Sequence, residues 1–286
     1  MADEWVVETV NDDWGFRTAL RATGGVTRIG SSQDLAVFDN PSFGRVMVLD
    51  GGFQITTADE FVYHEMMAHV PLFSHGAARD VLIVGGGDGG VAREVLRHPV
   101  ERLTMVEIDA SVVALAREHF PEVCAGAFDD QRLDLVIADG AAFVAAGEAA
   151  RFDVVIVDAP DPLGEGAVLF TPRFYAECRR LLRDGGVMVT QSGMPFLSPR
   201  WMREHAGHLR AAFPDVAFFL TTVPSYTGGP MAHGFSSSDA SLRETPVATI
   251  AMRHAALGGF ATRYWTPQVH VAAFALPPYV DEVVRP

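Results

Sequence analysis

The feature that most constrains the fold is an alternation of short apolar strands with helical segments, which begins after residue 57. A short apolar run between turn residues indicates a buried strand, whereas apolar residues that recur every three or four positions indicate a helix. Alternation of the two predicts an α/β fold with a mostly parallel sheet covered on both faces. We expect strands at 81–84, 103–107, 133–138, 152–157 and 187–190, helices at 89–97, 111–119 and 141–149, and another helix opened by Thr171 and Pro172.

The segment from residue 5 to about 57 is strand-like and predicts a small antiparallel sheet. Strands at 34–39 and 45–50 are separated by a turn at 40–44, and Gly51 and Gly52 form a second turn. A helix is expected to begin near Asp59. We therefore predict an N-terminal β domain at 1–60 and a catalytic domain at 61–286, in which 216–220 and 269–276 are read as closing strands.

Composition narrows the class of protein. With 49% hydrophobic and 20% charged residues the chain can build a packed core, and it lacks the ~20-residue apolar run of a membrane helix. The net charge of -14 repels nucleic acid and anionic membrane, and it suits a cationic substrate. No signal-peptide pattern is expected at the N-terminus, so Cys124 and Cys178 are read as free, buried thiols of a cytoplasmic protein.

Ligands of open α/β sheets bind at the carboxyl ends of the strands, so residues at these ends are candidates for a site. The first strand ends in the glycine loop 85–90, in which Gly85 and Gly87 allow a close approach of the backbone to a ligand. Glu107 ends the second strand, where a carboxylate accepts from ribose hydroxyls. Asp139 and Gly140 follow the third strand; Asp139 either accepts from an adenine amino group or caps a helix.

Asp88 lies within the glycine loop, at the start of a predicted helix. A phosphate or a ligand carboxylate at this helix N-terminus would be repelled by Asp88, whereas a ligand ammonium would be attracted. The loop therefore favours a nucleoside with a cationic tail.

Asp158 and Asp161 follow the fourth strand and are expected to make the same cleft acidic. Asp and Pro are also turn formers, so the alternative interpretation is a turn with no ligand. The ten histidines show no metal-ligand spacing, and no metal is expected.

Several stretches of the chain carry a family resemblance: 48–51 with Gln54, 59–66, 81–90, 106–109, 158–164, 223–226 and 272–277. In these stretches the sequence resembles the spermidine synthase family of polyamine aminopropyltransferases, more particularly its bacterial branch. The resemblance implies a Rossmann-like fold of the class I methyltransferase type and a homodimer or homotetramer. It implies transfer of the aminopropyl group of decarboxylated S-adenosylmethionine to putrescine, giving spermidine and methylthioadenosine.

The resemblance also implies residue roles. Asp158 matches the catalytic base, and Tyr63 and Asp161 match residues that orient the amine. Gln33, Glu107, Asp139, Gly140 and the glycine loop match the co-substrate site, in which Asp88 holds the transferred aminopropyl amine. His64, Asp88, Asp158, Asp161 and Tyr226 match the substrate pocket.

The match is weaker after the acidic pair. Glu165 stands where the family has a proline against the adenine side of the co-substrate. Between the two acids, Ala159 and Pro160 replace small hydroxyl residues. These differences bear on co-substrate affinity and on amine selectivity: putrescine remains the expected acceptor, with cadaverine, agmatine and spermidine as alternatives. Two other classes stay open: an S-adenosylmethionine-dependent methyltransferase of the same fold, and a nucleoside-binding protein without turnover.

Overall fold

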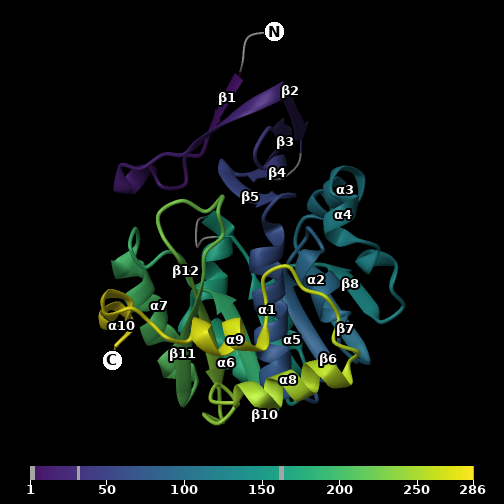
Figure 1. Cartoon of the computed structure of the whole chain (residues 1–286), viewed down its shortest axis with the longest axis vertical. Helices are drawn as coiled ribbons and strands as arrows, with labels where there is room; N and C mark the ends of the chain where they lie inside the picture. The colour runs from purple at the N-terminus through teal and green to yellow at the C-terminus, as the bar shows by residue number, and fades with distance from the viewer. Residues whose placement is uncertain (1–3, 31–32, 161–163, 286) are drawn as a thin grey trace.

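The computed structural model describes residues 4–30, 33–160 and 164–285 and contains two sheets. A five-stranded sheet lies above a seven-stranded sheet, and helices cover both faces of the larger one (Figure 1). The predicted combination of a small antiparallel sheet and a larger, mostly parallel one is confirmed.

The small sheet is antiparallel throughout, with its strands in chain order. Its predicted turn forms because the Asn40 side chain accepts from the backbone N–H groups of Ser42 and Phe43, at 2.9 and 3.0 Å. Gly44 then adopts a positive φ of 68°, which glycine tolerates without strain. The strands are β1 (Glu4–Val7), β2 (Ala19–Gly30), β3 (Asp34–Asn40), β4 (Gly44–Leu49) and β5 (Gly52–Thr56).

The large sheet has the strand order β11-β12-β10-β9-β6-β7-β8. The five strands from β10 to β8 are parallel, and β12 is antiparallel to both of its neighbours. The strands are β6 (Asp80–Gly85), β7 (Arg102–Glu107), β8 (Leu133–Ile137), β9 (Phe152–Asp158), β10 (Leu182–Gln191), β11 (Asp215–Thr221) and β12 (Met231–Ser237).

Several helices begin where a side chain accepts from an unpaired N–H of the first turn. Asp109 caps α3, Asp139 caps α5 and Thr171 caps α6. The helices are α1 (Glu60–His75), α2 (Gly90–Val95), α3 (Ala110–His119), α4 (Pro121–Cys124), α5 (Gly140–Ala146), α6 (Pro172–Leu181), α7 (Pro199–Ala212), α8 (Val247–Ala256), α9 (Pro267–Ala273) and α10 (Pro278–Val284).

One predicted strand is wrong. Residues 269–276 fall mostly in helix α9, which begins with Pro267 and is capped by the Thr266 side chain, a hydrogen-bond acceptor for Val269 N–H at 3.0 Å. The closing strand that pairs with β11 is instead β12, a buried strand rich in Gly, Ser and Ala that the sequence analysis did not identify. The other predicted closing strand, 216–220, is confirmed as part of β11.

The core divides into two layers because successive strand residues point to opposite faces of the sheet. Val81 and Ile83 of β6 pack on the face covered by α1, α2 and α8, whereas Leu82 and Val84 pack on the face covered by α5, α6 and α7. A third cluster joins β3, β4 and β5 to α3 and α4 through residues such as Leu35, Met47 and Phe120. The small sheet is therefore held by apolar packing against α3 and α4, the helices that follow strand β7 of the large sheet.

Cys124 and Cys178 are free and buried, as predicted. Within the described ranges, no helix combines the length and the apolar character needed to cross a membrane.

Candidate active site

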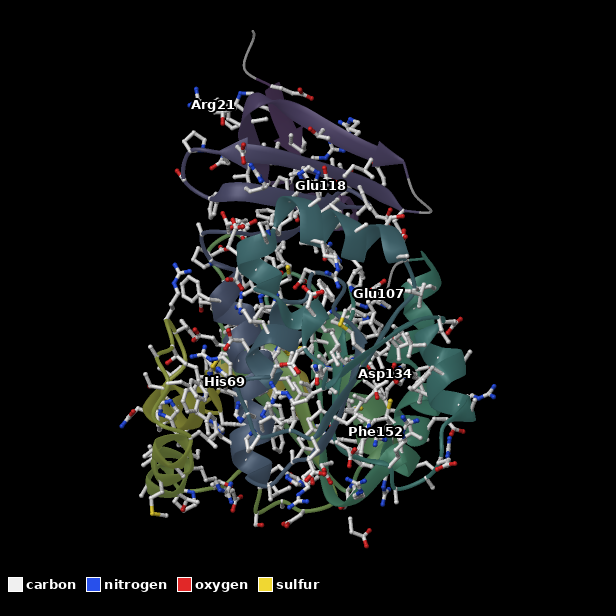
Figure 2. All side chains as sticks on the ribbon, turned by 90° about the vertical axis from the view of Figure 1, so that its right-hand side faces the viewer. Arg21, His69, Glu107, Glu118, Asp134 and Phe152 are labelled. Atoms are coloured by element: carbon white, nitrogen blue, oxygen red, sulfur yellow. The ribbon has the colours of Figure 1, made fainter. Side chains whose placement is uncertain are left out.

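The predicted site residues of three strands meet because β9, β6 and β7 are adjacent and parallel. Their carboxyl ends face the small sheet. Figure 2 shows Glu107, at the end of β7, on the side nearer the small sheet, with Phe152, at the start of β9, toward the opposite side. The site thus lies between the two sheets.

The glycine loop is pressed against the ends of the neighbouring strands. Gly86 N–H donates to the Asp158 carbonyl at 2.9 Å, and a Cβ on Gly85 would lie 2.0 Å from the same oxygen. A Cβ on Gly87 would lie 2.9 Å from Glu107 Oε2. The loop can pass close to the acidic strand ends only because these positions lack side chains.

Glu107 is a buried carboxyl group at the end of β7. Its Oε1 accepts from Asp109 N–H at 2.9 Å, which fixes the side chain. Burial raises the pKa of Glu107 to about 7, because the charged form loses hydration.

Asp158 and Tyr63 form the contact at the centre of the site. Tyr63, from α1, donates its hydroxyl to Asp158 Oδ1 at 2.8 Å. Asp158 Oδ2 is buried and has no hydrogen-bond partner among the described residues. Burial, together with the charge of Asp88, raises the pKa of Asp158 to about 6. A buried carboxylate oxygen without a donor points to a ligand donor, such as an ammonium.

Asp88 lies at the start of α2 with its carboxylate turned back onto the helix. Asp88 Oδ1 accepts from Gly90 N–H at 2.6 Å and lies 3.3 Å from His64 Nε2. Burial opposes its ionisation, but His64 outweighs burial and lowers the pKa of Asp88. Asp88 is thus held as an anion at the mouth of the glycine loop.

Tyr226 closes the site from the loop between β11 and β12. Its hydroxyl donates to the Gln54 carbonyl of β5, so this loop is tied to the small sheet. Its ring lies edge-on to that of Tyr63, with the centroids 6.3 Å apart. The two tyrosines therefore form one wall of the site.

The remaining predicted residues are placed less directly. Asp139 caps α5 by accepting from Ala142 N–H at 2.9 Å, the structural role weighed above, and Gly140 packs against Val84. Gln33 precedes β3, with its Nε2 3.5 Å from Asp50 Oδ2. Asp161 lies outside the described residues. Glu165 lies in the 3₁₀ segment Gly164–Phe170, and its side chain is outside the described part of the structure.

Two charged residues beside the site, Glu60 and Arg93, were not predicted from the sequence. Glu60 is buried and contacts both His64 and Arg93. The available signal was the Glu60–His64 spacing of four residues on one helix, which places two side chains on the same face.

Comparison with known proteins now assigns the family. Residues 60–245 match the family model described as "Spermine/spermidine synthase domain". Residues 29–57 match the model described as "Spermidine synthase tetramerisation domain". The chain belongs to the spermine/spermidine synthase family. This assigns it to the aminopropyltransferases and not to the methyltransferases that share the fold.

Relatives in sequence and structure agree with this family. The polyamine aminopropyltransferase of Pseudomonas syringae pv. tomato is 51% identical over 97% of this chain and 96% of its own. That of Ruegeria sp. is 50% identical over 88% of each chain. Among solved structures, spermidine synthase from Thermotoga maritima has a TM-score of 0.90 at 34% identity, covering 99% of this chain and 95% of its own. A spermidine synthase in complex with the transition-state analogue AdoDATO has a TM-score of 0.91 at 34% identity, covering 99% and 96%.

Proposed function

We propose that the enzyme transfers the aminopropyl group of decarboxylated S-adenosylmethionine to putrescine, giving spermidine and methylthioadenosine. The observation that supports this most is Asp158, whose Oδ2 is buried and lacks a partner among the described residues while Tyr63 holds Oδ1. An amine nucleophile supplies the missing donor. The bound transition-state analogue of a related spermidine synthase supports the same chemistry.

The reaction is a displacement at the carbon next to a sulfonium. The amine nitrogen forms a bond to that carbon, the carbon–sulfur bond breaks, and its electron pair stays on sulfur in neutral methylthioadenosine. A primary amine has a pKa of about 10 and is mostly protonated at neutral pH, so a base must first remove a proton. We assign this step to Asp158, and each turnover releases one proton to solvent.

Asp158 suits this role because its raised pKa, about 6, leaves it ionised at neutral pH yet more basic than an exposed aspartate. We assign the binding of the donor's ammonium to Asp88, the ribose hydroxyls to Glu107, and the adenine side to Asp139, Gly140 and Glu165. Gln33 is assigned to the donor, and His64, Asp161 and Tyr226 to the acceptor pocket. These roles remain predictions from the family resemblance.

We further propose that residues 1–60 form the oligomerisation domain and residues 61–286 the catalytic domain. The match of residues 29–57 to a tetramerisation domain supports an oligomer, either a dimer or a tetramer. The cytoplasmic location stays a prediction from the sequence.

The test is release of methylthioadenosine from decarboxylated S-adenosylmethionine with putrescine, cadaverine, agmatine or spermidine offered separately. We expect putrescine to give the highest kcat/KM and a product of the mass of spermidine. Faster release with another amine would correct the acceptor and leave the donor chemistry in place. No release with any amine would refute the proposed function.

A further inference from the structure

A chain of alternating charges runs from α2 through α1 to the glycine loop. Arg93 Nη2 lies 2.9 Å from Glu60 Oε2, and the same oxygen lies 2.5 Å from His64 Nδ1. The other ring nitrogen, Nε2, lies 3.3 Å from Asp88 Oδ1. Glu60 and Arg93 belong to neither the predicted site nor the mechanism above, so their role is open.

The contacts determine the protonation state of His64. Both ring nitrogens face carboxylate oxygens, and an ionised carboxylate only accepts hydrogen bonds. A neutral ring carries one N–H, so it would turn a lone pair toward Glu60 or toward Asp88. The ring is 1% exposed, so water has no ready access to relieve that repulsion. His64 is therefore a doubly protonated imidazolium that bridges the two acids.

The other groups around the ring agree with this state. Burial alone would lower the pKa of His64, but Asp88 and Glu60 outweigh it and raise the pKa to about 10. Arg93 contacts both oxygens of Glu60, and His64 together with Arg93 lowers the pKa of this carboxyl group against the effect of burial. The Tyr63 ring lies edge-on at 5.7 Å, and a Cβ on Gly90 would lie 2.2 Å from the imidazole. The ring has little room to turn.

This bridge sets the orientation of Asp88. The contacts from His64 and from Gly90 N–H both fall on Asp88 Oδ1, so the carboxylate is fixed by one oxygen and Oδ2 can accept from a ligand. If His64 lost one proton, either a neutral N–H or a lone pair would face Asp88 Oδ1 in place of the charged donor, so the carboxylate would be held less firmly in either case.

We propose that Glu60, supported by Arg93, is a positioning residue that keeps His64 doubly protonated and thereby holds Asp88 in the orientation that binds the ammonium of the donor. This inference rests on the proposed function, in which Asp88 contacts that ammonium. It adds Glu60 and Arg93 to the residues on which donor binding depends.

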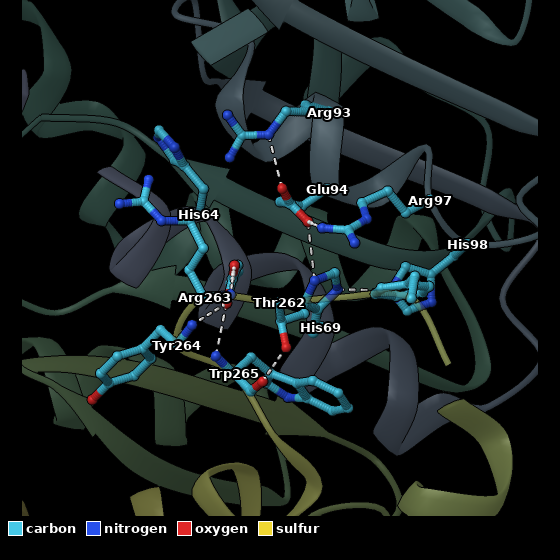
Figure 3. A network of polar contacts seen from close by, with 12 residues as sticks. His64, His69, Arg93, Glu94, Arg97, His98, Thr262, Arg263, Tyr264 and Trp265 are labelled. Carbon is cyan, nitrogen blue, oxygen red and sulfur yellow. Dashed lines mark hydrogen bonds and ion pairs between the residues drawn. The ribbon is translucent and has the colours of Figure 1, made fainter. Parts of the chain in front are cut away.

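Glu94 provides a matched control. It is also a buried carboxylate in contact with Arg93, through Oε1 at 2.8 Å, but its other contacts are with Arg97 and His69. Figure 3 shows this branch leading from Arg93 through Glu94 to His69 and His98, with His64 apart from it. Loss of the Glu94 charge therefore perturbs Arg93 without removing a partner of His64.

The experiment compares E60Q and E94Q with the wild type in donor kinetics from pH 6 to pH 9. In the wild type, His64 should stay doubly protonated over this range, because its pKa is raised to about 10. Its ionisation should therefore cause no rise of KM for decarboxylated S-adenosylmethionine between pH 6 and pH 9. In E60Q the ring loses one carboxylate partner, so its pKa falls. We expect KM for the donor to rise at least tenfold from pH 6 to pH 9, while E94Q follows the wild-type profile.

Two measurements that need no turnover separate a specific effect on the donor's ammonium from a general loss of structure in E60Q. Methylthioadenosine lacks the ammonium that Asp88 would bind, so its Kd should stay within about twofold of the wild-type value in E60Q. Nitrogen NMR of the His64 ring should show a doubly protonated ring at pH 8 in the wild type and a neutral one in E60Q. If E60Q does not fold, R93K takes its place, with a smaller rise of KM in the same direction.

A neutral His64 ring in the wild type at pH 8 would overturn the inference, as would equal pH profiles of E60Q and E94Q. If the wild type turns over no amine, the proposed function fails, whereas the NMR measurement still reports on the imidazolium. The two failures are therefore distinguishable.

Discussion

Replacement of Asp158 by asparagine tests the assignment of the base most sharply, because it keeps the shape of the side chain. The amide oxygen of the new side chain can still accept from the Tyr63 hydroxyl, which donates to Asp158 Oδ1 at 2.8 Å in the wild type. What is lost is the buried oxygen that has no partner among the described residues and that would take the proton from the amine.

The expected loss of rate follows from the assignment of Asp158 as the general base. A positioned general base contributes about 10²–10⁴-fold to the rate, which corresponds to about 2.7–5.4 kcal/mol in activation free energy. The wild-type rate should also rise with pH through about 6, the raised pKa of Asp158, and this dependence should be missing from D158N.

The same substitution should stabilise the fold. The pKa of Asp158 is raised on folding, from 3.8 to about 6, so ionisation costs folding free energy that grows above pH 3.8 and is complete above pH 6. The size of this cost is at most about 3 kcal/mol, because one pKa unit corresponds to about 1.4 kcal/mol. D158N should therefore have a higher Tm than the wild type at pH 8 and a smaller advantage at pH 5.

The assay combines methylthioadenosine release under saturating donor and putrescine with thermal unfolding at both pH values. D158N should lose at least a hundredfold in kcat, keep the Kd for methylthioadenosine within about threefold, and gain stability at pH 8. A kcat within tenfold of the wild type would refute the assignment of Asp158 as the base.

Other positions give further predictions. Binding of methylthioadenosine should tighten from pH 6 to pH 8, because Glu107, with a pKa of about 7, becomes an ionised acceptor for the ribose; titration calorimetry should show no such trend in E107Q. G87A should weaken methylthioadenosine binding at least tenfold, about 1.4 kcal/mol, because the added Cβ would lie 2.9 Å from Glu107 Oε2. An unchanged Kd would show that the glycine is not needed for the close approach of the loop to Glu107. E65Q should lower the free energy of unfolding by about 2–4 kcal/mol in urea titrations, because Glu65 accepts three backbone N–H bonds from residues 263–265; a loss below 1 kcal/mol would contradict this.

The sequence predicted the parallel strands well because each contains a short apolar run, and three of them, β6, β7 and β9, end in Gly or an acid. The apolar runs of β6, β7, β9 and β10 are buried on both faces, so apolar content alone identifies them, whereas the edge strand β8 is partly exposed. The site residues at the strand ends followed from the same logic, since the ends of adjacent parallel strands share an edge.

Errors arose where periodicity was ambiguous or absent. Residues 269–276 are apolar but short, and the helix is decided by its start, where Thr266 caps and Pro267 occupies the first turn. Strand β12 contains Gly234 and two serines and lacks the apolar run expected of a buried strand. It is extended because it pairs with β10 on one side and with β11 on the other.

Contacts between distant residues were also beyond the sequence. The Tyr226 hydroxyl meets the Gln54 carbonyl across 172 positions, and Arg93 meets Glu60 across 33. Local spacing indicated Glu60 and His64 as helix neighbours, but only the packing of α2 on α1 brings Arg93 to the same carboxylate.

The central claim is that an acidic site selects a donor with an ammonium tail and no carboxylate. The most direct test offers decarboxylated S-adenosylmethionine and S-adenosylmethionine separately with putrescine and identifies the products by mass. The account predicts spermidine and methylthioadenosine from the decarboxylated donor, and at least a hundredfold lower kcat/KM with S-adenosylmethionine, whose carboxylate would face Asp88. Equal use of the two donors, or a methylated amine as the main product, would contradict it.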